Sequence, residues 1–229
     1  MALLRIDVIT LFPQMFYGPF GESILKRAEE RGIIELNVVD LRDYTHDKYR
    51  TVDERPFGGG AGMVMKCEPL FEAVEALKTP DAKVVALCPT GETFSQQKAK
   101  ALTAEKHLIM ICGHYEGIDE RVHKALVDIE LSIGDYVLTN GNLAAMVITD
   151  AVCRLLPDVL DGSETLEDES FNEGLLEYPH YTRPRVFQGM EVPEVLLSGN
   201  HAQIEEWRRQ QAVIRTKQRR PDLLRDAEK

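Results

Sequence analysis

The pattern of apolar and polar residues along the chain changes its period repeatedly, and each change marks an expected element. Short runs rich in branched apolar residues read as strands, and they lie at Arg5–Phe12, Ile33–Leu41, Lys83–Pro89, His107–Gly113 and Val127–Gly134. Runs of this length that are bounded by turn residues are typical of buried strands. The sequence therefore predicts five strands in its first two thirds.

Helical spacing fills most of the intervals between these runs. Apolar residues recur every three or four positions from Pro13 to Arg31, which predicts a helix that stops at Gly32. Further helices are expected at Glu68–Lys78, after Ser95 as an N-cap, around Asp119–Ala125 and at His201–Lys217. Strands that alternate with helices indicate an α/β fold with a mainly parallel sheet.

Three unusual loops follow strands of this expected sheet. They read CPTGETF, CGHYEGIDE and IGDYVLTNGN, and each combines glycine with proline or an aromatic residue. Ligands bind beyond the carboxyl ends of parallel strands, so the three loops predict one shared pocket. The chain contains neither a G-x-G-x-x-G nor a G-K-[ST] sequence, which excludes the usual nucleotide-phosphate loops.

A fourth glycine-rich segment, PFGGGAGMVMK at Pro56–Lys66, allows two interpretations. Its glycines could expose backbone N–H groups as a phosphate nest, or they could form a flexible cluster of turns. A P-loop is excluded because no Lys-Ser/Thr pair follows the last glycine.

The character of the chain changes after Leu156. An acidic, turn-rich stretch leads to a basic helix, whereas the preceding part alternates strands and helices. We expect a main α/β domain at 1–160, a linker at 161–173 and a small helical C-terminal domain at 174–229. The linker carries a cluster of carboxylates in the sequence ETLEDESFNEG. Taken alone, this cluster indicates a solvent-exposed segment.

Composition restricts the class of protein. The hydrophobic share of 44% and the charged share of 28% are ordinary for a soluble globular protein, and no apolar stretch approaches the ~20 residues of a membrane helix. Asp7 interrupts the apolar N-terminus, so we do not read it as a signal peptide. Four cysteines without a C-x-x-C pair suit free thiols in the cytoplasm, and the six histidines show no metal-ligand spacing.

Net charge is −11, which argues weakly against a nucleic-acid partner. The stretch Arg208–Arg220 nevertheless holds six basic residues and no acidic one. It reads either as a solvated helix face or as a patch that binds phosphates, because charge acts over only ~8–10 Å at cellular salt.

Seven segments occur together in order across nearly the whole chain. They are DVITLFPQMF, PFGGGAGMVMK, CGHYEGIDERV, SIGDYVL with AAMVITDAVCRLLP, ESFNEGLLEYPHYTRP, VPEVLLSGNH and RTKQRRPDLL. The set resembles the bacterial tRNA (guanine-37-N1)-methyltransferases of the SPOUT superfamily. This resemblance implies a deep trefoil knot, an exception to the rule against knots.

The resemblance also implies a cofactor, S-adenosylmethionine, held in the knot largely by backbone groups. Carried onto this chain, the cofactor-binding positions are Leu87, Cys88, Pro89, Gly91, Gly113, Tyr115, Glu116, Ile133, Gly134, Asp135, Tyr136, Val137, Leu138 and Gly141. Members of the family are reported to need Mg²⁺, and no ligand set in this sequence identifies its site.

The family acts as a homodimer on the anticodon stem-loop of tRNA, at guanosine 37 after guanosine 36. The resemblance implies that the linker orders over the partner's methyl donor and that the C-terminal domain grips the RNA. The tRNA-binding positions are then Ser170, Arg208, Arg209, Arg215, Lys217, Arg219 and Arg220. The target base is expected to leave the anticodon-loop stack to reach the methyl donor.

Methylation of guanine N1 requires a general base, since this nitrogen carries a proton at neutral pH. The family supplies an aspartate in Asp-Ser-Phe and an arginine, which Arg154 matches. This chain reads Glu169-Ser170-Phe171, so Glu169 is favoured as the base over the adjacent Asp168. Three further departures are His114, where others have arginine, and Asn140 and Asn142, where many have glycine and glutamate.

Two alternatives stay open. One is a SPOUT methyltransferase that acts on another RNA position, and the other is a non-catalytic RNA-binding protein with this fold. Arg154 and the carboxylate at Glu169 argue against the second alternative. The match through RTKQRRPDLL argues against the first.

Overall fold

A computed structural model describes residues 2–160, 169–171 and 174–226 of the chain. The chain divides into two compact units, Met1–Asp161 and Gly162–Lys229. The expected linker, 161–173, lies mostly outside the described residues and stays a prediction. Each unit is described below by itself.

The first unit is built on one parallel sheet of five strands. In spatial order these are β2 (Ile34–Asp40), β1 (Leu4–Thr10), β6 (His107–Cys112), β5 (Ala82–Thr93) and β7 (Ile129–Ser132). All neighbours pair in parallel. The predicted α/β fold with a mainly parallel sheet is therefore confirmed.

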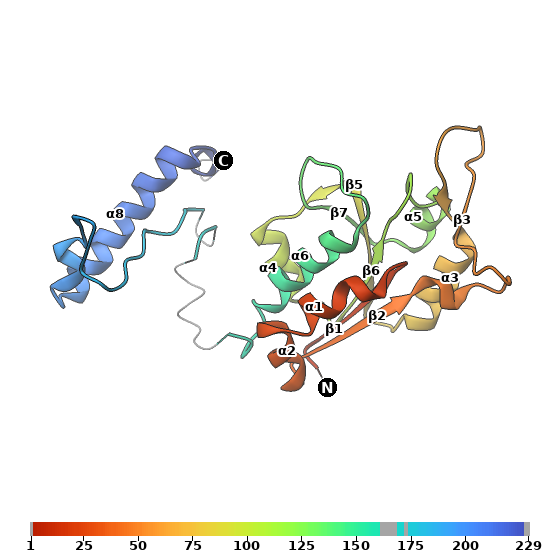
Figure 1. The fold of residues 1–229 in the computed structure, drawn as a ribbon, viewed down its shortest axis with the longest axis horizontal. Helices are drawn as coiled ribbons and strands as arrows, with labels where there is room; N and C mark the ends of the chain where they lie inside the picture. Colours follow the sequence, from red (N-terminus) through yellow and green to blue (C-terminus); the bar gives the residue numbers. More distant parts are fainter. Residues whose placement is uncertain (1, 161–168, 172–173, 227–229) are drawn as a thin grey trace. The chain divides into compact units, whose positions relative to one another are not determined.

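Helices cover both faces of this sheet (Figure 1). One face packs against η1 (Pro13–Phe16), α1 (Tyr17–Phe20), α2 (Ser23–Glu30), α4 (Gln96–Leu102) and α6 (Asn142–Cys153). The other face packs against η2 (Leu41–Tyr44), α3 (Cys67–Leu77) and α5 (Glu120–Leu126). Successive side chains of a strand point to opposite faces, so a strand buried on both faces is apolar throughout, as the runs indicated.

The expected single helix from Pro13 to Arg31 is wrong. The chain instead forms η1, then α1 directly after it, and then α2, with a break between α1 and α2 at Gly21 and Glu22. Gly18, Pro19 and Gly21 are poor helix residues, and this local cost outweighs the apolar period. The end before Gly32 is confirmed, with Gly32 at φ +69°.

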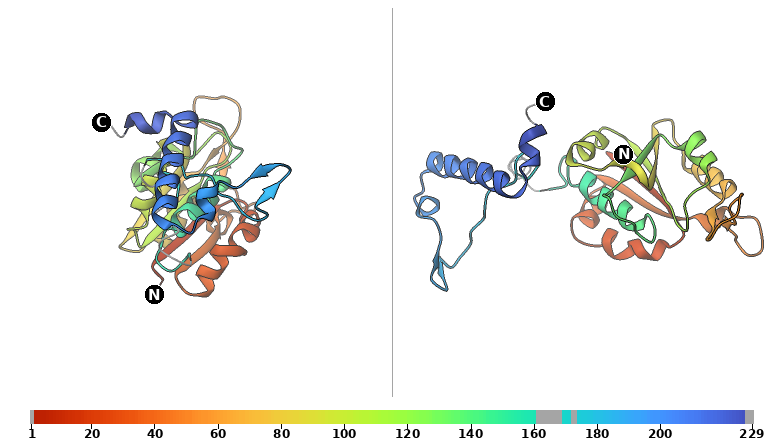
Figure 2. Two further views of the ribbon diagram at one scale, coloured as in Figure 1. Left: turned by 90° about the vertical axis from the view of Figure 1, so that its left-hand side faces the viewer. Right: turned by 90° about the horizontal axis from the view of Figure 1, so that it is seen from above.

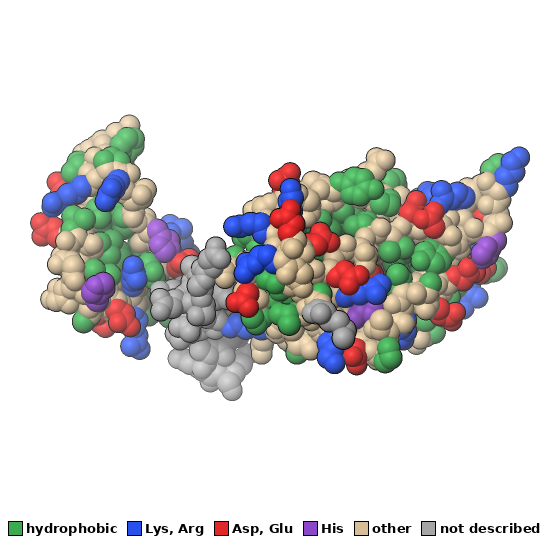
Figure 3. Space-filling model, turned by 90° about the horizontal axis from the view of Figure 1, so that it is seen from below, with side chains coloured by type: hydrophobic (Ala, Val, Ile, Leu, Met, Phe, Trp, Pro, Cys, Tyr) green, Lys and Arg blue, Asp and Glu red, His purple; other side chains and the backbone are tan. Residues whose placement is uncertain are grey.

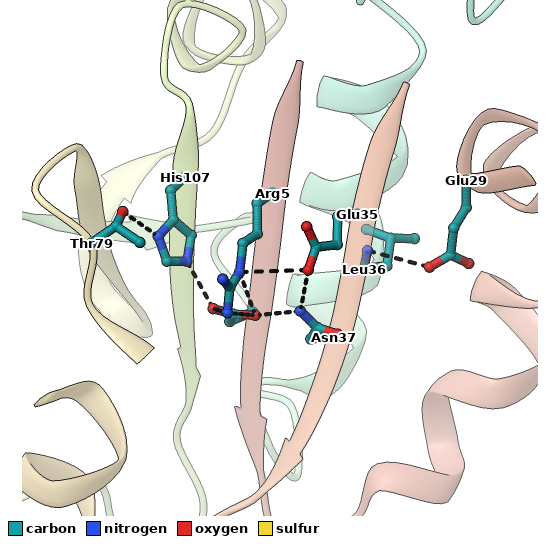
Figure 4. A network of polar contacts seen from close by, with 8 residues as sticks. Arg5, Glu29, Glu35, Leu36, Asn37, Thr79 and His107 are labelled. Atoms are coloured by element: carbon teal, nitrogen blue, oxygen red, sulfur yellow. Dashed lines mark hydrogen bonds and ion pairs between the residues drawn. The ribbon is translucent and has the colours of Figure 1, made fainter. Parts of the chain in front are cut away.

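Asp7, the charge inside the first apolar run, is buried, and its partners come from three strands. Figure 4 shows this polar network, with Arg5, Asn37 and His107 labelled. Its carboxylate accepts hydrogen bonds from Arg5 and from Asn37, whose Nδ2 lies at 2.9 Å, and contacts Nε2 of His107 at 2.8 Å. The other ring nitrogen of His107 contacts the Thr79 hydroxyl at 2.9 Å. These partners compensate the loss of water that a buried carboxylate suffers.

The second unit centres on α8 (His201–Arg219), which extends two residues beyond the predicted end. Asn200 caps it through its side chain. A hairpin of β8 (Val186–Phe187) and β9 (Met190–Glu191) projects away from this helix (Figure 2). The described part of this unit also contains the 3-10 helix η3 (Glu194–Leu197) and α9 (Asp222–Asp226).

Candidate functional site

A cavity of the first unit lies beyond the carboxyl ends of β5, β6 and β7. Its volume is about 410 Å³, within the ~300–1,000 Å³ typical of small-molecule pockets. The walls come from residues 87–90, 113–118, 131–134 and 136–141, with His123 of α5 and Ala144 of α6. The three loops singled out in the sequence therefore do meet around one cavity.

All the expected cofactor-binding positions line this cavity except Gly91 and Asp135. Thr90 and His114 lie within the segments expected to form the pocket, whereas the sequence reasoning did not assign to it the lining residues Gly117, Ile118, His123, Leu131, Ser132, Thr139, Asn140 and Ala144. Most of these lie in the same loops, so contiguity could have found them. His123 and Ala144 lie on helices, and only the tertiary structure shows that they reach the cavity.

Two glycines serve the close approach of chain segments. A Cβ at Gly91 would lie 2.5 Å from the carbonyl carbon of Glu130 and 2.7 Å from that of Leu131, in the backbone of β7. A Cβ at Gly141 would lie 2.9 Å from Cα of Cys112. Backbone cannot yield as a side-chain end can, so these positions require glycine. Gly91 does not line the cavity itself. It allows β5 to approach β7, whose Leu131 does line it.

Hydrogen bonds join the walls of the cavity to one another. The N–H of Gly141 donates to the carbonyl of Gly113 at 2.8 Å, and His114 and Asn140 form an antiparallel bridge. Strand β5 has a bulge between Leu87 and Glu92, both of which pair with Leu131 of β7. The expected loop CPTGETF is therefore a bulged strand, which turns Cys88 and Pro89 toward the cavity.

The glycine-rich segment Pro56–Lys66 is hydrogen-bonded to the 116–117 part of the same wall. It forms β4 (Val64–Met65), which pairs with β3 (Asp53–Glu54), and the N–H of Met65 donates to Gly117 at 2.9 Å. The N–H of Glu116 donates to Met63 at 3.0 Å. A Cβ at Gly62 would collide with the Glu116 side chain. The segment is thus a turn cluster that supports Glu116.

Charge in the cavity wall favours a neutral or cationic ligand group over a phosphate. Among the described residues that line it, none is lysine or arginine, and the carboxylate is that of Glu116. Leu87, Ile133 and Leu138 provide apolar surface. Nucleotide phosphates are normally met by cations or exposed N–H nests, so this composition fits a nucleoside-like ligand without a phosphate chain.

The three cysteines outside the cavity wall are poor nucleophiles. Burial, and then the Asp119 carboxylate, raise the pKa of the Cys67 thiol to about 11. Burial raises the pKa of Cys153 to about 12 and raises the pKa of Cys112 as well. Arg121 forms paired hydrogen bonds with Asp119 and holds the pKa of that carboxyl well below its usual range. All four thiols are free, and Cys67 and Cys88 are half-buried.

The expected catalytic residues belong to different units. Arg154 is the half-buried C-cap of α6 in the first unit. Glu169 is half-buried and begins the described part of the second unit. Asp168, the other candidate base, lies outside the described residues.

The segment after Glu169 is folded onto α8. The hydroxyl of Ser170 accepts the N–H of Glu177 at 2.9 Å, and the Thr216 hydroxyl accepts the N–H of Leu176 at 2.9 Å. Arg215 donates to the carbonyl of Glu177 at 3.2 Å. Ser170 and Arg215, two expected RNA contacts, therefore also hold this segment together.

The remaining expected RNA contacts differ in exposure. Arg208 is half-buried over the ring of Tyr178 at 4.7 Å, and Arg220 pairs with Asp222 at 2.6 Å. Arg209, Lys217 and Arg219 are exposed. On the face drawn in Figure 3, basic side chains of this unit are spread among acidic ones.

No group of three or more His, Cys, Asp or Glu that could hold a metal occurs among the described residues. Within the same residues, no helix is long and apolar enough to cross a membrane.

The first unit has a parallel sheet with a cavity at the carboxyl ends of its strands, and the second unit is helical with exposed basic residues. A cavity at this edge of a parallel sheet is typical of α/β proteins that bind small ligands. Comparison with known proteins narrows this class. The family described as "tRNA (Guanine-1)-methyltransferase TrmD" matches residues 4–226, and the chain belongs to this family.

The chain is also similar to curated proteins over most of their length. The chain is 54% identical to a tRNA (guanine-N(1)-)-methyltransferase of Desulforamulus reducens over 98% of this chain and 90% of the relative. It is 57% identical to that of Dictyoglomus turgidum over 97% and 90%. It is also 57% identical to that of Bacillus cereus over 98% and 93%.

Proposed function

We propose that the protein transfers a methyl group from S-adenosylmethionine to N1 of guanosine 37 in tRNA. The observation that carries this proposal is the cavity, to which all three strand-end loops of a member of this family contribute. The substrate class follows from the names of the relatives. Free thiols and a tRNA substrate suit the cytoplasm.

The residues of the cavity fit S-adenosylmethionine. Its adenosine would lie between apolar wall residues such as Leu87, Ile133 and Leu138, with backbone groups at its edge. A wall without lysine or arginine suits its positive sulfonium, and Glu116 offers a carboxylate for its hydroxyl or ammonium groups. When bound, the cofactor supplies an electrophilic methyl group. Any Mg²⁺ site stays unassigned.

Two side chains would act on the guanine. The Glu169 carboxylate would accept the proton of guanine N1, and this nitrogen would then be nucleophilic. Arg154 donates hydrogen bonds to O6, where negative charge develops. The half-buried position of both residues limits screening by water.

The tRNA would be held by the second unit. Arg209, Lys217 and Arg219 are exposed and can pair with backbone phosphates, which supplies affinity without sequence information. Sequence would be read at the anticodon-loop bases.

We further propose that two copies form a homodimer through α6. Leu143 and Val147, one helical turn apart, are each 47% exposed, and Met15 and Tyr17 of the adjoining η1 and α1 are 40% and 67% exposed. η1 packs against α6. Apolar side chains gathered on one face are typical of interfaces.

Leu143→Arg is expected to shift the protein from dimer to monomer in sedimentation velocity. Dimer formation would bury the unpaired charge of the arginine in this face, which is costly. Leu3→Arg is the matched control, since Leu3 is 50% exposed at the other end of the first unit. A dimer unchanged by Leu143→Arg would place the interface elsewhere.

The proposed reaction is tested with labelled S-adenosylmethionine and two tRNA transcripts that differ at one base. The transcript with guanosines at 36 and 37 is expected to accept one methyl group, and mass analysis of its digest is expected to give N1-methylguanosine. Adenosine at 37 should abolish transfer. Equal methylation of both transcripts would disprove the assignment and would favour another RNA position.

Cys88 is expected to react with iodoacetamide first at pH 8, and S-adenosylhomocysteine is expected to slow this reaction. A thiol with a pKa of about 11, as for Cys67, is only about one-thousandth thiolate at this pH. Cys88 lines the cavity, so a bound ligand would shield it. Peptide mapping by mass spectrometry gives the order, and labelling without protection would place the ligand elsewhere.

A further inference from the structure

Asn142 is a polar side chain in the core at the start of α6. It is 1% exposed, and a buried amide is costly unless its hydrogen bonds are made. Its Oδ1 accepts the hydroxyl of Thr10 at 2.9 Å, and its Nδ2 donates to Sδ of Met15 at 3.1 Å. The first residue of α6 is thereby attached to the end of β1, which is 132 positions away in sequence.

A second set of contacts joins the same point to the cavity. The N–H of Asn142 donates to Oδ1 of Asn140 at 2.9 Å, and Asn140 bridges to His114. The ring of His114 lies 5.3 Å from the ring of Phe12, and the N–H of Phe12 donates to the Thr10 hydroxyl at 3.0 Å.

These contacts form a closed circuit of five residues, Thr10, Asn142, Asn140, His114 and Phe12. Asn140 and His114 line the cavity, whereas Thr10 and Asn142 are buried outside it. In this circuit the Thr10 hydroxyl is the shared atom, because it donates to Asn142 and accepts from Phe12. Its removal would open the circuit on both sides.

We propose that Thr10 and Asn142 are positioning residues, which hold the 140–141 wall of the cavity against the 113–115 wall in the arrangement that binds S-adenosylmethionine. The inference rests on the proposed function of the cavity. Without these hydrogen bonds, the 140–141 wall would adopt the binding arrangement for a smaller fraction of the time. The apparent affinity for S-adenosylmethionine falls in proportion to that fraction.

The test compares Thr10→Val, Thr10→Ser and Thr149→Val in the full chain. Valine keeps the shape of threonine and lacks the hydroxyl, whereas serine keeps the hydroxyl. Thr149 is a matched control, because it is fully buried in α6 and its hydroxyl contacts only Sδ of Met110, at 4.0 Å, among the hydrogen bonds described. Calorimetry gives Kd for S-adenosylmethionine, and kinetics on the guanosine-37 transcript give KM and kcat.

Thr10→Val is expected to raise Kd and KM for S-adenosylmethionine about tenfold or more, because both hydrogen bonds of the Thr10 hydroxyl are lost, with kcat changed about twofold or less. Thr10→Ser and Thr149→Val should stay within about twofold of the unchanged protein. Amide hydrogen exchange at Gly141, whose N–H is bonded to Gly113, should accelerate in Thr10→Val only. If Thr10→Val does not fold, Asn142→Leu replaces it, since leucine has a similar size and removes the acceptor for the Thr10 hydroxyl.

The inference is overturned if Thr10→Val lowers the melting temperature but binds the cofactor as the unchanged protein does. A purely structural bond would give that result. It is also overturned if Thr149→Val weakens binding equally, since any loosening of α6 would then suffice. Failure of the unchanged protein to bind S-adenosylmethionine would overturn the proposed function, and this inference with it.

Discussion

Glu169→Gln is expected to lower kcat for methylation of guanosine 37 about 10²–10⁴-fold, the usual contribution of a general base. Glutamine keeps the size of the side chain but cannot accept the N1 proton. The Kd for S-adenosylmethionine should change little, because the expected cofactor positions lie in the first unit and Glu169 lies in the second. Single-turnover kinetics and calorimetry measure the two quantities.

Asp168→Asn is the control for this change, as it removes the neighbouring carboxylate. It is expected to leave kcat within a few-fold. Glu169→Asp keeps a carboxylate of similar intrinsic pKa and should retain more activity than Glu169→Gln. Full activity in Glu169→Gln with loss in Asp168→Asn would move the role of base to Asp168.

Gly91→Ala is expected to lower the melting temperature by about 5–10 °C and to weaken binding of S-adenosylmethionine at least tenfold. The added Cβ would meet three backbone atoms of Glu130 and Leu131. Overpacking of this kind costs about 1–3 kcal/mol or more, because β7 must move. Leu131 and Ser132 of β7 line the cavity, so the shift would reach the ligand. Thermal unfolding followed by circular dichroism, and calorimetry, check both effects.

Gly18→Ala is the matched control, because no atom lies within 4 Å of the Cβ that it would add. Its melting temperature should stay within about 1–2 °C, since alanine is favoured in helices. An equally small effect of Gly91→Ala would show that β7 yields easily at this point.

Much of the fold was predictable because local patterns and tertiary packing agree. The five apolar runs became the five strands, and Ser95 caps α4 through its side chain as expected. The failure at Pro13–Arg31 has a local cause, since an apolar period says which residues are buried but not where glycine and proline interrupt the helix.

The cavity was predictable to the extent that the order of strands and loops along the chain determines which loops lie together. Three loops that follow parallel strands must meet at one sheet edge, and they do so around the cavity. Asn140, Asn142 and His114, which were only departures in sequence, lie in one circuit, and no local pattern could join Asn142 to Thr10. The division of the chain between Arg154 and Glu169, in contrast, had a local signal, because the composition changes after Leu156.

The sequence by itself determined the parallel α/β architecture, the three cavity loops and the basic C-terminal helix, because periodicity and turn chemistry act within a few residues. Only the tertiary structure decided that Gly91 supports β7, that the glycine-rich segment supports Glu116, and that Asp7 is buried with His107. Each of these depends on contact between residues far apart in the chain. Such contacts arise when whole elements pack, and apolar burial does not specify the polar partners in advance.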